Sequence, residues 1–142
     1  MVDICPVFWI GYEVTTSLEL IEKVTIMVDP GSGDEQTKQI PAYALERIRE
    51  LARGSKVIYA SHRVELDIVD NLCMSQEEVC RCLASLESSH FRHSKLYPNQ
   101  RKWMDVYCPT WAVNGQVHDL YIKLMLSRNV MTVTLCSFHW QR

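Results

Sequence analysis

The stretch that decides the fold is residues 117–138, which read VHDLYIKLMLSRNVMTVTLCSF. Residues 117–126 and 130–138 are both rich in β-branched and apolar residues, and Ser127-Arg128-Asn129 lies between them as a short polar connection. This arrangement is typical of two antiparallel strands joined by a turn. The sequence therefore predicts a β-hairpin as the last large element of the chain.

Side chains on a strand alternate between its two faces. In the first strand of this hairpin, Leu120, Ile122 and Leu124 are expected to point into the core. Tyr121 and Lys123 then project from the opposite face. That opposite face is the candidate location for a functional site.

Two amphipathic helices are predicted upstream of the hairpin. The first begins at Pro41 and ends at Gly54, because apolar residues recur between them at helical spacing and these two residue types mark helix starts and stops. The second begins at Ser75-Gln76-Glu77-Glu78, which fits a capping box, and its apolar stripe comprises Val79, Cys82, Leu83 and Leu86.

The segment between these helices is less clear. Residues 56–60 suit a short strand, and residues 64–69 suit either its continuation or another helix. Helices first and strands last indicate an α+β fold, with the helices packed on one face of an antiparallel sheet.

Domain organisation is suggested by Asp29-Pro30-Gly31-Ser32-Gly33-Asp34, a strong turn or linker signal. We expect a boundary near residue 40, with residues 1–40 forming an N-terminal extension and residues 41–142 the functional domain. Met27 lies just before this linker, so the extension is either real or the product of a start codon placed too far upstream.

The composition is that of an ordinary globular domain, with 142 residues of which 47% are hydrophobic and 23% charged. The chain contains no run of the roughly 18 apolar residues that a membrane helix requires. Its first segment lacks the basic start and cleavage site of a signal peptide. These features predict a cytoplasmic protein without membrane contact, whose six cysteines are reduced.

Charge is distributed unevenly along the chain. Residues 1–40 carry two lysines and seven acidic residues, whereas residues 41–142 carry thirteen Lys or Arg against ten acidic residues, an excess of three. Residues 87–142 also hold four of the five histidines. A polyanion such as nucleic acid would be attracted to this region, although a solvated charged face explains the charge equally well.

Cleavage of RNA without a metal cofactor needs a base for the 2′-hydroxyl proton, an acid for the leaving 5′-oxygen, and cations for the phosphate. The C-terminal third holds side chains of these kinds, namely Arg92, His93, Lys95, Tyr121, Lys123 and His139. Taken singly, each also has an ordinary structural interpretation, such as a surface histidine, a half-buried sheet tyrosine or a solubilising lysine.

Several spaced motifs in this third resemble the motility quorum-sensing regulator (MqsR) toxin family. The family pattern has an LxxSxF helix end followed by a basic residue and Ser, a Trp-x-Asp-Val-Tyr strand, a Gly before a Tyr-x-Lys strand, and a Ser-Phe-basic strand. Here the matching segments are Leu86 to Phe91, then Arg92-His93-Ser94, Trp103-Met104-Asp105-Val106-Tyr107, Gly115, Tyr121-Ile122-Lys123 and Ser137-Phe138-His139. Ordered matches of this kind are harder to obtain by chance than a single motif.

The resemblance covers roughly residues 40–140 and implies both a fold and a function. The fold would be RelE-like, with N-terminal helices against a curved antiparallel sheet. The function would be that of a type II toxin, an endoribonuclease that cuts messenger RNA and is controlled by a cognate DNA-binding antitoxin of the MqsA kind. No cofactor is implied.

The resemblance also assigns roles to particular residues. The family's catalytic lysines fall on His93 and His139, and its tyrosine falls on Tyr121. One of the two histidines would remove the 2′-hydroxyl proton and the other would protonate the leaving oxygen. Tyr121 would orient the phosphate, and its developing charge would be neutralised by Arg92, Lys95 or Lys123.

Two positions complicate this assignment. The family's glutamine, expected to contact RNA, falls on Met104, which lacks a comparable hydrogen-bonding group. Strict alternation along the last strand places His139 on the face of Val133 and Leu135, the wrong face for a site residue. A β-bulge, or a strand that ends at Phe138, would resolve the conflict.

Two other functions compete with RNA cleavage. Cys80-x-Cys82 and His90-x-x-His93 offer four zinc ligands, although the cysteine spacing is too short for a usual structural zinc site and Cys82 falls on an apolar stripe. The altered residues at positions 93, 104 and 139 are also compatible with a module that binds RNA or an antitoxin without cutting.

Overall fold

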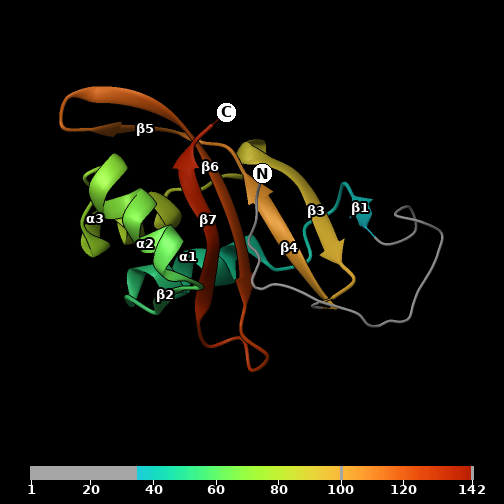
Figure 1. The fold of residues 1–142 in the computed structure, drawn as a ribbon. Helices are drawn as coiled ribbons and strands as arrows, with labels where there is room; N and C mark the ends of the chain where they lie inside the picture. The colour runs from blue at the N-terminus through green and yellow to red at the C-terminus, as the bar shows by residue number, and fades with distance from the viewer. Residues whose placement is uncertain (1–34, 100, 142) are drawn as a thin grey trace. The chain divides into compact units, whose positions relative to one another are not determined.

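The computed structural model describes residues 35–99 and 101–141 (Figure 1). In chain order its elements are β1 (Gln36–Lys38), α1 (Leu45–Arg53), β2 (Val57–Tyr59), α2 (His62–Leu66), a π-helical turn (Asp67–Asn71), α3 (Gln76–Ala84), a 3-10 turn (Ser88–His90), β3 (Phe91–Tyr97), β4 (Lys102–Tyr107), β5 (Thr110–Val113), β6 (Gln116–Leu126) and β7 (Val133–Trp140). The described residues 38–95 and 103–141 form one compact unit. All described helices and all candidate site residues belong to this unit. The predicted N-terminal extension lies almost entirely outside the described residues.

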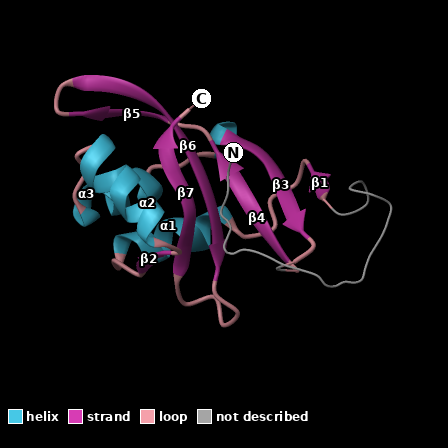
Figure 2. Ribbon diagram, in the orientation of Figure 1, coloured by secondary structure: helices cyan, strands magenta, loops and turns pink. Residues whose placement is uncertain are grey.

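The strands follow the order β1-β3-β4-β6-β7-β2, and β5 pairs with β6. β6 is antiparallel to β4, β5 and β7, whereas β2 is parallel to β7. The three α-helices gather on one side of β6 and β7 (Figure 2). The predicted α+β class, with helices on one face of a mostly antiparallel sheet, is therefore confirmed.

Both predicted helices are present, although α1 begins at Leu45 rather than at Pro41 and has no side-chain cap. A local side-chain contact marks the start of α3. Ser75 Oγ accepts a hydrogen bond from Glu78 N at 3.2 Å, and Glu78 Oε1 accepts one from Ser75 N at 3.3 Å, which completes the predicted capping box of α3. α1 begins after Ala44 and is followed by Gly54.

The ambiguous segment resolves into a short strand and a helical stretch. Residues 57–59 form β2, and α2 begins after Ser61, whose side chain accepts from Val64 N. The helix then widens into the π-helical turn at Asp67. Asn71 Nδ2 donates to the buried Asp67 carboxylate at 3.1 Å, so the turn supplies its own partner for that charge.

The core lies between the helices and β6–β7. Leu120, Ile122 and Leu124 are completely buried, as their alternation predicts, and Phe138 on β7 is buried beside them. Burial of each such side chain contributes about 1.5–3 kcal/mol. Because one face of β6 is anchored in this way, the register of the strand is fixed and its other face is held at a defined position.

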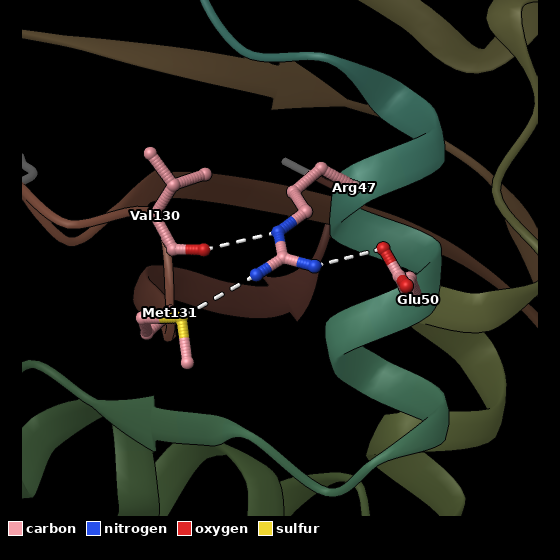
Figure 3. A network of polar contacts seen from close by, with 4 residues as sticks. All are labelled: Arg47, Glu50, Val130 and Met131. Carbon is pink, nitrogen blue, oxygen red and sulfur yellow. Dashed lines mark hydrogen bonds and ion pairs between the residues drawn. The ribbon is translucent and has the colours of Figure 1, made fainter.

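The turn between β6 and β7 is attached to α1 through Arg47 (Figure 3). The Arg47 guanidinium donates to the Val130 carbonyl at 3.0 Å and contacts Met131 Sδ at 3.5 Å. It also forms an ion pair with Glu50 at 2.8 Å, one turn along the same helix. These contacts link the β6–β7 turn to α1.

Candidate active site

A β-bulge in β7 places His139 on the same face as Tyr121. Lys123 pairs with Ser137, but Leu124 pairs with Leu135, so Cys136 is an extra residue on β7. Before the bulge, Leu135 points into the core, as strict alternation predicts. After the extra residue Cys136, the side chains of β7 switch faces, and His139 pairs directly with Tyr121. The conflict raised by strict alternation is therefore resolved by a bulge.

Tyr121 and His139 stack on each other. Their ring centroids are 5.2 Å apart and their planes differ by 9°. His139 Nδ1 lies 2.7 Å from the carbonyl oxygen of Trp140. A carbonyl only accepts, so Nδ1 carries a proton, and in the neutral ring the lone pair is on Nε2. The backbone thus fixes the tautomer of this partly exposed imidazole.

His93 lies on β3 in a cationic environment. Burial lowers the pKa of His93 below its ordinary value, and the positive charges of Lys95 and Lys123 lower it further. Lys95 shares a face of β3 with His93, and Lys123 is a neighbour of Tyr121 on β6. The electrostatic coupling connects the β3 part of the candidate site with the β6 part.

The other two candidate residues differ in exposure. Arg92 is exposed, and its guanidinium donates to the carbonyls of Ser89, His90 and Phe91 at 3.3–3.4 Å. The Met104 side chain is buried, and its backbone carbonyl accepts from Ser94 Oγ at 3.4 Å. Direct RNA contact by these two residues remains a prediction.

The motif that contains Met104 also holds a structural centre that the sequence reasoning did not identify. Asp105 is completely buried, and its carboxylate accepts from Ala42 N at 2.9 Å and from Tyr43 N at 3.1 Å. Burial and the charge of Asp105 raise the pKa of Tyr43 to about 12, with a smaller contribution from Cys136. An acidic residue between the apolar residues Met104 and Val106 was the available signal for this role.

Metal-ligating side chains do not cluster in the part of the chain that the structure describes. Within residues 35–99 and 101–141, no group of three or more His, Cys, Asp or Glu could hold an ion. Cys82 is buried on the apolar stripe of α3, as predicted, and this burial raises the pKa of its thiol to about 12. Of the described helices, none has the length and apolar composition needed to span a bilayer.

The fold and this face define a small α+β protein whose sheet carries a stacked tyrosine–histidine pair opposite its helices, with the buried Lys123 on the same face. Residues 40–140 match the family described as the motility quorum-sensing regulator, toxin of MqsA. The chain belongs to this family, which confirms the predicted resemblance. It is accordingly a toxin of a toxin–antitoxin system, with an antitoxin as partner. A search of the curated proteins finds no match to the chain.

Proposed function

We propose that this toxin is an endoribonuclease that cuts messenger RNA by attack of a ribose 2′-hydroxyl on the adjacent phosphate. The observation that carries the proposal is the pairing of Tyr121 with His139 on the sheet face that also bears Lys123. A cytoplasmic location and an MqsA-like, DNA-binding antitoxin belong to the same proposal.

The two histidines divide the proton transfers. Because its pKa is lowered, His93 is neutral at pH 7 and accepts the 2′-hydroxyl proton. The 2′-oxygen then bonds to phosphorus, and the bond from phosphorus to the 5′-oxygen breaks. His139 in its protonated form donates from Nε2 to the leaving oxygen, while its Nδ1–H remains bonded to the Trp140 carbonyl. The products are a 2′,3′-cyclic phosphate and a 5′-hydroxyl.

Neighbouring groups stabilise the charge that develops on the phosphate. Lys95 and Lys123 already act on His93 electrostatically, and their ammonium groups favour the phosphorane over the ground state. Arg92 adds a further cation at the start of β3. The Tyr121 hydroxyl orients the phosphate, and its stacking on His139 holds the two rings in register.

The test is incubation of purified protein with a defined single-stranded RNA in EDTA, followed by analysis of the fragment ends. We expect cyclic phosphate ends with the natural chain. His93→Ala and His139→Ala should each reduce kcat/KM by about 10² to 10⁴, the usual contribution of a general acid or base. His62→Ala is the matched control, because His62 lies on α2 and contacts Glu65 at 3.3 Å.

Three outcomes would contradict parts of this proposal. Cleavage that survives the double substitution of His93 and His139 would exclude the histidine mechanism. Cleavage that EDTA abolishes would indicate metal chemistry. An RNA left intact by folded protein would favour either a ribosome-dependent enzyme or a module that binds without cutting.

The binding module is the second candidate function, and Met104 is the observation that favours it. Its buried thioether cannot replace the hydrogen bonds of an amide at the position where the family has glutamine. Met104→Gln separates the two functions. An enzyme impaired at this position gains cleavage from the amide, whereas a pure binding module remains inactive with either residue.

A further inference from the structure

Trp140 connects the candidate site to a second histidine on the other face of the sheet. Its carbonyl oxygen lies 2.7 Å from His139 Nδ1, and its indole Nε1 donates to His118 Nδ1 at 3.0 Å. The rings of His118 and Trp140 also lie against each other, with their centroids 5.7 Å apart. Because side chains alternate along β6, His118 shares the face of Leu120 and not that of Tyr121. Trp140 therefore contacts one histidine on each face of the sheet.

The two contacts require opposite tautomers of the two imidazoles. An indole N–H only donates, so His118 Nδ1 is unprotonated and accepts, and the proton of that neutral ring is on Nε2. A carbonyl only accepts, so the neutral His139 ring carries its proton on Nδ1. The tautomer of an imidazole is set by the hydrogen bond that one of its nitrogens makes. Trp140 thus determines the position of the proton on both rings.

The Trp140 carbonyl lies outside the main-chain pairing of the described strands. Leu120 is the partner of Trp140 on β6, and Leu120 N donates instead to the Pro109 carbonyl at 2.9 Å. On the other side of β7, the described pairing with β2 covers residues 133–135. Strand pairing at Trp140 therefore does not hold this carbonyl, and the indole contact with His118 anchors the residue at the end of β7.

We propose that His118 is a positioning residue for His139 and that it acts through Trp140. This inference rests on the proposed role of His139 as the general acid. The His118 ring holds the indole, and the Trp140 carbonyl holds the Nδ1–H of His139. Nε2 of His139 is then the nitrogen that is left for the leaving oxygen. Loss of the indole bond releases the Trp140 peptide, so the His139 ring loses its preference for one tautomer.

The direct test measures the tautomer of His139 in the full chain without RNA. Long-range ¹H–¹⁵N NMR spectra, recorded at a pH at which histidine is neutral, distinguish the Nδ1–H form from the Nε2–H form. The signal of His139 is identified by its loss in His139→Ala. We expect the Nδ1–H form in the natural chain. His118→Leu and Trp140→Phe each remove one partner of the indole bond, and both should convert His139 to a mixture of tautomers.

Two matched variants separate the loss of this bond from the loss of ring volume. In His118→Asn, the amide oxygen takes the place of Nδ1 and still accepts from the indole, so the Nδ1–H form of His139 should be retained. Trp111 pairs with His118 across β5 and β6, and its Nε1 has no hydrogen-bond partner within the described residues. Trp111→Phe therefore removes an unbonded indole N–H beside the same histidine and should leave the tautomer unchanged.

Cleavage of RNA provides the second readout. His118→Leu and Trp140→Phe should each reduce kcat/KM by about two- to tenfold, the factor that corresponds to one neutral hydrogen bond. Because both variants break the same contact, the double variant should lose no more than the weaker single variant. His118→Asn and Trp111→Phe should retain the kcat/KM of the natural chain.

The outcomes separate this inference from the proposed function. An Nε2–H form of His139 in the natural chain would overturn the inference, and so would an Nδ1–H form that persists in both His118→Leu and Trp140→Phe. A tautomer that changes in these two variants of a chain that does not cut RNA would uphold the contact and overturn the proposed function. Equal kcat/KM in every variant despite that change would refute His139 as the acid.

Discussion

Asp105 attaches β4 to the segment that leads into α1, and its replacement measures the strength of that attachment. The carboxylate is completely buried and accepts from two backbone donors, Ala42 N and Tyr43 N. A hydrogen bond to a charged group contributes about 1.5–3 kcal/mol net. We expect Asp105→Ala to lower the free energy of unfolding by about 3–5 kcal/mol, because two donors lose their partner and a buried void remains.

Urea unfolding followed by circular dichroism measures this loss, with Asp105→Asn as the matched variant. The asparagine oxygen still accepts from one N–H, so we expect a smaller loss of about 1–3 kcal/mol. The same variant should lower the pKa of Tyr43 from about 12 toward its ordinary value, which ultraviolet titration detects. Losses below about 1 kcal/mol in both variants would refute the reasoning, since two charge-assisted bonds would then contribute almost nothing.

Three other predictions concern proton transfer, capping and the hairpin turn. Lys95→Met removes a positive charge that lowers the pKa of His93, so that pKa should rise. The acidic limb of the pH profile of kcat/KM should then move to higher pH. An unchanged limb would exclude His93 as the base. Ser75→Ala should lower the free energy of unfolding, measured with urea, by about 1 kcal/mol, because the Glu78 N–H loses its acceptor. An unchanged free energy would mean that the capping box adds no stability. Arg47→Ala should lower the free energy of unfolding by less than about 1 kcal/mol, because Arg47 is partly exposed. A larger loss in the same assay would show that the contact of Arg47 with the turn anchors the hairpin.

The fold was predictable from the sequence where local chemistry decides the structure. The capping box at Ser75 identifies its helix without reference to the rest of the chain, since every interaction in it spans three residues. The alternation of Leu120, Ile122 and Leu124 likewise follows from the geometry of one strand. The parallel pairing of β2 with β7 is different, because it joins Val57 to Val133 and no local pattern encodes it.

The sequence suggests residue types for the candidate site, and these assignments stay predictions; its geometry was predictable only in part. Alternation assigns Tyr121 and Lys123 to one face correctly, yet it assigns His139 to the other face, because a bulge at Cys136 depends on pairing with β6. The buried hydrogen bonds of Asp105 also depend on tertiary structure, since their donors lie 62 and 63 residues away. The residue types suggest the chemistry, whereas the pairing register of β6 and β7 determines which side chains lie together.

The position of β7 in the sheet has a consequence for synthesis of the toxin on a ribosome. β7 follows every other described element in the chain, yet it lies between β6 and β2 in the sheet. Until it is made, β2 lacks its partner strand and the helices lack Phe138, so the core stays open. Folding therefore waits for the last strand, which also carries His139. A growing chain that has not yet reached β7 lacks both Phe138, which the core contains, and His139, which stacks on Tyr121.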